Sequence, residues 1–148
     1  MAILDDKLLL SDKQRICSTA GTTRTLSTNL IDFGAEDLNP GIGTPLYLSI
    51  RTCATFTHGA PLTGGITFKL KSATGTAFND TASILEKTML NSTLKANQTI
   101  LQIPLPTTGV KRYLRLLYVM STQADTGFTD SFVDAWISSA VPDSDVGT

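Results

Sequence analysis

Histidine, cysteine and charge are all scarce in this chain. It has one histidine and two cysteines among 148 residues, and Asp, Glu, Lys and Arg together make up 17%. The histidine, His58, lies in the stretch THGAPLTGG, and an imidazole with no clustered partner is more typical of a polar loop residue than of a general base. The chain also has no Gly-x-Ser-x-Gly elbow and no Gly-rich phosphate loop with its lysine. We therefore expect no enzyme activity, no catalytic residue, no cofactor and no metal centre.

The charge balance and the short apolar runs disfavour two classes of partner. The net charge is -1, so the chain has no basic excess to hold the phosphates of a nucleic acid. The longest apolar run near the start, Leu8–Leu10, is too short for a membrane-spanning helix or the core of a signal peptide. We expect a protein that binds neither nucleic acid nor membrane and that matures in the cytosol where it is made.

The sequence offers few side chains for a disulfide or a metal site. Cys17 and Cys53 belong to no Cys-x-x-Cys pair, which favours two buried thiols over a disulfide. The stretch DFGAEDLNPG brings Asp32, Glu36 and Asp37 together in sequence, and these could supply some of the six or more oxygens that calcium requires. Solvated acids are the ordinary occupants of such turns, so we interpret them as surface carboxylates.

The abundant residues favour strands and turns. Threonine and serine account for 35 residues (23 Thr and 12 Ser), with 11 Gly and 6 Pro between the apolar segments, and that mixture disfavours helices. Alternating apolar residues predict strands at 27–33, 45–56, 65–71, 82–90, 99–105, 112–120 and 131–138. Pro104 and Pro106 cannot donate to a ladder, so the strand at 99–105 should lie at a sheet edge or end there.

This spacing of short strands predicts an all-β fold. Seven or eight strands separated by turn signals are typical of a single antiparallel β-sandwich or jelly roll. We expect residues 1–148 to form one such domain, with residues 1–16 as an extended N-terminal arm or first strand and residues 141–148 as a C-terminal tail.

Two of the predicted strands are apolar on both faces. The segment 112–120 alternates Leu114, Leu116, Tyr118 and Met120 with Tyr113, Arg115, Leu117 and Val119. In 131–138, Trp136 shares a face with Phe132 and Asp134, opposite Val133, Ala135 and Ile137. A half-buried antiparallel strand normally shows water a polar face, so the second faces need a cover. The two segments also lie close enough in sequence to pair as a hairpin.

The expected cover is another protein subunit. We predict that Leu114, Leu116, Tyr118 and Met120 face the core, and that Tyr113, Arg115, Leu117, Val119 and Trp136 are interface residues. Arg115 would pair with a carboxylate or a backbone carbonyl near the seam. Replacing Leu117 with Lys should then disrupt the oligomer and spare the fold. The alternative is that a second layer of the same chain covers this face.

Five stretches together resemble a known family. MAILDDKLLLSDKQRI, STNLIDFG, GTPLYLSIRT, GGITFKLKSATGTAF and YLRLLYVM, in this order and at these spacings, are similar to the cement or decoration proteins of tailed-bacteriophage capsids. The resemblance spans roughly Ile3 to Val119, and order and spacing carry more weight than any single motif. The stretch STQADTGFTDSFVDAWI departs from the pattern, where a shorter Gly-containing turn and an Ala/Ile strand would usually follow.

The resemblance implies a structural role in the virion. Such proteins resemble jelly rolls that associate with themselves, here a dimer in preference to a trimer, and sit on the capsid exterior after synthesis in the host cytoplasm. They bridge neighbouring major capsid proteins and hold the shell against DNA pressure. The alternative is a carbohydrate- or receptor-binding β-sandwich of a tail or fibre, with Tyr47, Phe128 and Trp136 as an aromatic platform.

Overall fold

The computed structural model describes residues 9–17, 24–34, 45–57, 64–78, 83–106, 109–121 and 128–138. Its elements are β1 (Leu9–Arg15), β2 (Arg24–Leu26), β3 (Ile31–Asp32), β4 (Tyr47–Thr52), β5 (Gly65–Ala73), β6 (Ser83–Leu90), the 3-10 helix η2 (Asn91–Thr93), β7 (Thr99–Pro104), β8 (Tyr113–Ser121) and β9 (Phe132–Ser138). Within these segments no helix is long and apolar enough to span a membrane. His58, Glu36, Asp37 and the predicted tail at 141–148 lie outside the described residues.

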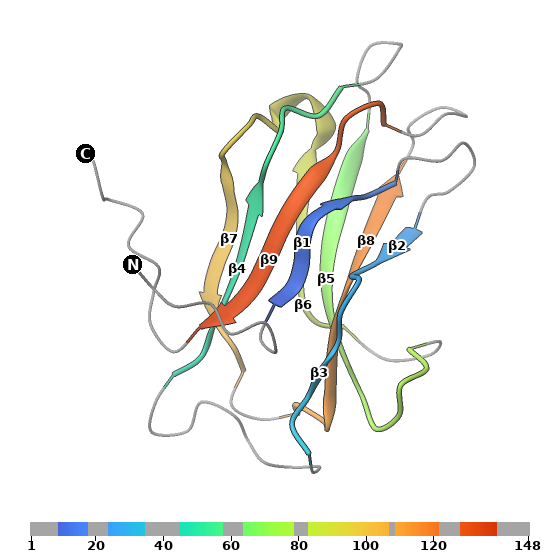
Figure 1. The fold of residues 1–148 in the computed structure, drawn as a ribbon, viewed down its shortest axis with the longest axis vertical. Helices are drawn as coiled ribbons and strands as arrows, with labels where there is room; N and C mark the ends of the chain where they lie inside the picture. The colour runs from blue at the N-terminus through green and yellow to red at the C-terminus, as the bar shows by residue number, and fades with distance from the viewer. Residues whose placement is uncertain are drawn as a thin grey trace.

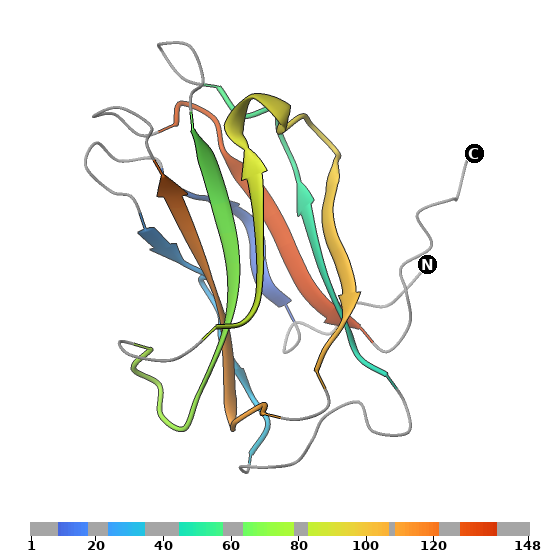
Figure 2. The ribbon, with the colours of Figure 1, turned by 180° about the vertical axis from the view of Figure 1, so that it is seen from behind.

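Two antiparallel sheets form the two layers of the molecule (Figures 1 and 2). Sheet A has the strand order β1-β9-β4-β7, and sheet B has the order β2-β8-β5-β6, with β3 also paired to β8. Because β2 and β3 pair with different parts of β8, they act as one interrupted strand. The arrangement is then the eight-strand order of a jelly roll, which confirms the predicted antiparallel β-sandwich.

The core lies between the inward rows of the two sheets. Alternate residues of a strand point to opposite faces. Eleven apolar residues in the inward rows of the four central strands are each at most 1% exposed: Leu48, Ile50, Ile66, Phe68, Leu70, Leu114, Leu116, Tyr118, Val133, Ala135 and Ile137. The predicted inward row of β8, with Met120 at 5% exposure, is confirmed. A buried hydrogen bond of 2.7 Å between the Ser11 and Tyr118 hydroxyls ties β1 of sheet A to β8 of sheet B.

The segment at residues 9–15 is a strand and not an arm. β1 pairs along β9 with two register shifts, and Lys13 takes a positive φ of 41° at this irregular stretch. Leu10 and Ile16 are fully buried in the core. An extended arm reaching Ile16 is therefore wrong for the described residues, and the first-strand alternative holds, because these apolar side chains close one edge of the core. Residues 1–8 are outside the described segments.

The predicted hairpin of β8 and β9 does not form. β8 pairs with β5, β2 and β3 in sheet B, whereas β9 pairs with β4 and β1 in sheet A. In this topology the chain passes from one sheet to the other after β1, β3, β4, β6, β7 and β8. β5 and β6 are joined within sheet B as a hairpin. Closeness in sequence was misleading here. With β8 and β9 in opposite sheets, the apolar rows of the two strands face each other across the core, whereas a β8–β9 hairpin would leave these rows without that cover.

Only residues 31–32 of the predicted strand at 27–33 form a strand, β3, and the short strand β2 precedes the predicted range. The chain is a strand at β2 and β3 but not between them, because the Ser27 hydroxyl replaces a backbone partner: it accepts a 3.1 Å hydrogen bond from the Leu116 amide and donates a 2.8 Å bond to the Asn29 carbonyl. Serine side chains compete with ladder hydrogen bonds in this way. β7 lies at the edge of sheet A and ends at Pro104, as the two prolines predicted.

Candidate functional site: the outward sides of the two sheets

Leu117 is covered by its own chain. It lies in the outward row of β8, yet it is only 4% exposed. Leu26 of β2 is its register partner on one side, and Phe78, which follows β5 and is 6% exposed, lines the same pocket of about 300 Å³ with Arg24. The main core cluster includes neither Leu117 nor Phe78. The prediction that a partner chain buries Leu117 is therefore wrong, because this side chain is already buried in the single chain, beside Leu26 and Phe78.

Arg115 lies in the outward row of β8, two residues before Leu117, and its side chain binds a backbone carbonyl. Its Nε donates a 2.9 Å hydrogen bond to the Ser27 carbonyl oxygen, and partial burial lowers the pKa of the guanidinium from its usual value. The predicted carbonyl partner is found, but it belongs to the same chain. Tyr113 and Val119 are half-buried in this row, and their contact with a second subunit stays a prediction.

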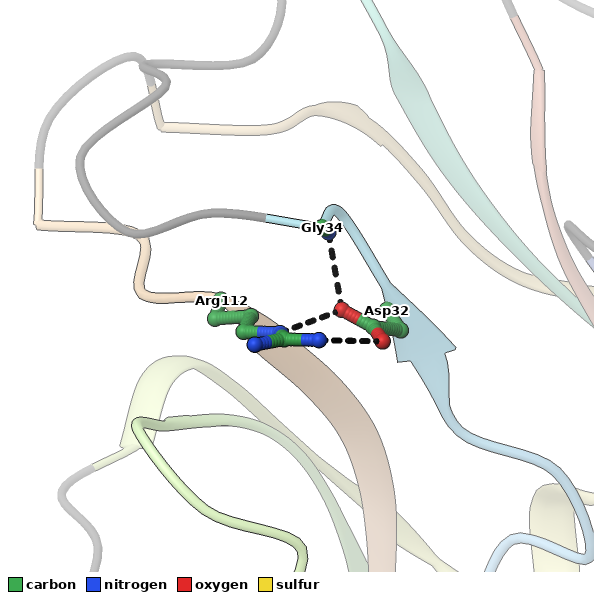
Figure 3. A network of polar contacts seen from close by, with 3 residues as sticks. All are labelled: Asp32, Gly34 and Arg112. Carbon is green, nitrogen blue, oxygen red and sulfur yellow. Dashed lines mark hydrogen bonds and ion pairs between the residues drawn. The ribbon is translucent and has the colours of Figure 1, made fainter.

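Asp32 and Arg112 hold β3 against the start of β8 (Figure 3). Arg112 Nε and Nη2 donate to the two carboxylate oxygens of Asp32 at 2.8 and 3.1 Å, and the Gly34 amide donates to Asp32 Oδ1 at 2.8 Å. These hydrogen bonds to the charged carboxylate lower the pKa of Asp32. Arg112 also lies 5.0 Å from the centroid of the Tyr113 ring. Both carboxylate oxygens of Asp32 are therefore already bound by Arg112. Asp32 is for this reason a poor member of the suggested calcium ligand set.

Trp136 lies on the opposite side of the sandwich from the other predicted interface residues. It is half-buried on the outward side of sheet A, where its register partners are Leu9 of β1 and Ser49 of β4. Tyr47 is two residues from Ser49 and so shares this outward side. Phe128 instead is buried in the core, with its ring 5.1 Å from that of Phe56. The suggested aromatic platform is wrong for Phe128, and the structure brings together only Tyr47 and Trp136.

Both cysteines are free thiols of low reactivity. Cys17 is buried and Cys53 is half-buried. Burial raises the pKa of Cys17, and burial together with the neighbouring Asp134 carboxylate raises the pKa of Cys53 to about 12. Thiolates are the reactive form of cysteine, so both side chains are protonated at neutral pH. In the described part of the chain, no group of three or more His, Cys, Asp or Glu side chains could hold a metal ion.

Sequence reasoning missed Arg24, Leu26 and Phe78. The strand prediction began at Ser27, and Phe78 was noted only as the last residue of the stretch GGITFKLKSATGTAF. The alternation of Arg24, Thr25 and Leu26 was the available signal, because it places a charged and an apolar side chain on one side of a short strand. No local pattern shows that Phe78 lines a pocket with Leu117 of β8, since that placement depends on tertiary packing.

These features define an antiparallel jelly-roll sandwich with charged side chains on the outward sides of its sheets, together with Tyr47 and Trp136. Residues 10–133 match the sequence model of the Bbp16 family, and the chain therefore belongs to that family. A search of curated proteins finds no match.

Proposed function

We propose that the protein is a structural virion protein that cements the outside of a tailed-phage capsid by bridging neighbouring major capsid proteins. The observation that carries the proposal is the ordered set of five motifs. The motifs run from roughly Ile3 to Val119, nearly the same part of the chain as the Bbp16 match at 10–133. The jelly roll supports it, because its two outward sheet faces offer contact surface without requiring any chemistry.

The proposal includes self-association as a dimer on the capsid exterior. Trp136 and Leu9 are half-buried residues on the outward side of sheet A that a second subunit would cover further. An obligate interface of this kind typically buries about 2,000 Å² or more. Many copies acting together would stabilise a shell more than any single contact does.

Counting copies per particle tests this function. Quantitative mass spectrometry of gradient-purified particles should find this chain in numbers comparable to the major capsid protein. A few tens of copies or fewer would place it in the tail or fibre, and absence from the particle would reject a virion role.

A sugar- or receptor-binding module is the second candidate, favoured by the shared outward side of Tyr47 and Trp136 (sheet A). Aromatic rings on such a surface can stack on apolar ligand faces. Trp136→Ala should then abolish binding to immobilised host-surface glycans while leaving particle incorporation unchanged. Cement function predicts no glycan binding by the unmodified protein in the same assay.

A further inference from the structure

On the outward side of sheet B, the described residues include more cations than carboxylates, although the whole chain has a net charge of -1. Register pairing places Lys69 and Lys71 of β5 beside Leu117 and Arg115 of β8. Arg24 of β2 pairs with Val119 on the same side. Residues directly opposite one another in an antiparallel pair share a face, so these cations point the same way as the outward row of β8.

Few carboxylates offset these cations. Glu86 of β6 is the register partner of Lys69, and the two form a 3.5 Å ion pair. Asp32 is paired with Arg112. Lys71 is 8% exposed and has an interaction of its own, so it is not counted here. Among the other described residues of these strands, the three cations Arg24, Lys69 and Arg115 face one carboxylate besides Asp32, that of Glu86. We call this side of sheet B the basic face.

An apolar pocket opens within the basic face. Arg24, Leu26, Phe78 and Leu117 line its volume of about 300 Å³. Leu26 is 38% exposed, which is unusual for a large apolar side chain in this structure. Arg24 is exposed and forms no hydrogen bond or ion pair with another described residue. The basic face thus combines an apolar cavity with an adjacent guanidinium that is available to a ligand.

We propose that the basic face is the docking surface for an acidic protein segment, which places an apolar side chain in the pocket and a carboxylate against Arg24. The inference rests on the proposed function, in which that segment belongs to the capsid shell. Charge complementarity selects an acidic partner, because complementary potentials speed encounter and suppress wrong partners. Planar guanidinium groups bind carboxylates through paired hydrogen bonds, so Arg24 fixes the orientation of the segment.

A protein segment fits this surface better than a nucleic acid does. Nucleic-acid binding needs several cations free to neutralise phosphates. Here Lys69 is shared with Glu86, Lys71 is 8% exposed, and Arg115 is bonded to the Ser27 carbonyl. The Tyr113 ring already lies against Arg112, which leaves it a poor platform for stacking bases. A phosphate backbone also has no apolar side chain that would fill the pocket.

Cosedimentation with shells assembled without this chain tests the proposal. The full-length protein is compared with Arg24→Glu and Leu26→Asp, both at exposed positions of the basic face. Arg51→Glu is the matched control, because Arg51 is exposed on the outward side of sheet A and its described side-chain contact is a 3.4 Å hydrogen bond to Asn97. Thermal unfolding of each variant checks that the fold is retained.

We expect Arg24→Glu and Leu26→Asp each to weaken shell binding by about tenfold or more, and Arg51→Glu to bind like the unmodified protein. Rising salt should weaken the unmodified protein more than Arg24→Glu. If the unmodified protein binds shells and Arg24→Glu binds equally well, the docking surface is refuted while the cement function stands. If only Arg51→Glu loses binding, the surface lies on sheet A and the inference is wrong.

Two further outcomes overturn the inference in other ways. Failure of the unmodified protein to bind shells would reject the proposed function, and the docking surface with it. Tight binding of a fluorescent DNA duplex that is lost in Arg24→Glu, measured by anisotropy, would mean that the basic face serves a nucleic acid.

Discussion

Leu117 determines whether the outward row of β8 belongs to the fold or to an interface. Because it is 4% exposed in the single chain, Leu117→Lys would bury an unpaired ammonium group. We expect it to lower the free energy of unfolding by about 2–4 kcal/mol, measured by urea denaturation. The earlier expectation that this substitution spares the fold is thereby reversed.

The matched control is Leu90→Lys, at a leucine that is 62% exposed on β6. We expect a change of less than about 0.5 kcal/mol there, as for most surface substitutions. Equal, small effects at the two leucines would mean that Phe78 does not cover Leu117 in solution.

The Asp32–Arg112 pair should make stability depend on pH. The folded-state pKa of Asp32 is lowered by its hydrogen bonds to Arg112 and Gly34, so its contribution is fully present above the unfolded-state pKa of about 3.9. That contribution is lost as the pH falls through the lower, folded-state value. Asp32→Asn should therefore be less stable than the unmodified protein at neutral pH, and the gap should shrink in acid.

Urea denaturation at a series of pH values between neutrality and strong acid measures the gap. Arg112→Gln should show the same convergence, because it removes the partner that lowers the pKa. A gap that stays constant down to the lowest pH would show that the carboxylate charge is not the source of the stabilisation.

Edge strands show how a charged side chain can limit association. β6 is one of the edge strands of sheet B in the described structure. Lys87 is exposed in the core-facing row of β6, opposite Phe68 and between Leu85 and Met89. Inward-pointing charges on edge strands prevent edge-to-edge pairing. We therefore expect the charge of Lys87 to prevent β6, whose core-facing row is otherwise apolar, from pairing with the edge strand of another molecule.

Replacing Lys87 with an apolar residue should promote association through β6. We expect Lys87→Val to form concentration-dependent oligomers in size-exclusion chromatography with light scattering, because Val favours strands and removes the charge. Thr88→Val, on the outward row of the same strand, is the control and should elute like the unmodified protein. If both variants elute unchanged, Lys87 has no such role.

The strands themselves were largely predictable because their side chains alternate strictly. The segment at 65–71 reads as Ile66, Phe68 and Leu70 against Thr67 and Lys69, and β5 buries the first set. β2 was not predicted, since three residues carry too little periodicity. The interruption between β2 and β3 was also missed, because it depends on a Ser27 hydrogen bond to Leu116, a residue far away in sequence.

The assembly of strands into sheets was less predictable than the strands. A jelly roll joins most successive strands across its two layers, and the alternation pattern of a strand shows which side is apolar but not which sheet lies opposite. For the same reason only part of the candidate site could be predicted from the sequence. The outward row of β8 could be read from its alternation, but the covering Phe78 and the neighbouring Arg24 come from segments placed by tertiary packing.

The place of β1 in the sandwich leads to a test of the complete fold. β1 forms one edge of sheet A, puts Leu10 into the core and joins Ser11 to Tyr118 of sheet B. Leu10→Ala should therefore lower the free energy of unfolding by about 2–5 kcal/mol, as truncation of buried leucines does. Leu9→Ala, at the half-buried outward neighbour, should cost clearly less. Denaturant unfolding of both variants decides the matter: small and equal effects would mean that residues 9–15 behave as a dispensable arm, whereas a large effect at Leu10 alone means that the sandwich requires β1 to close its core.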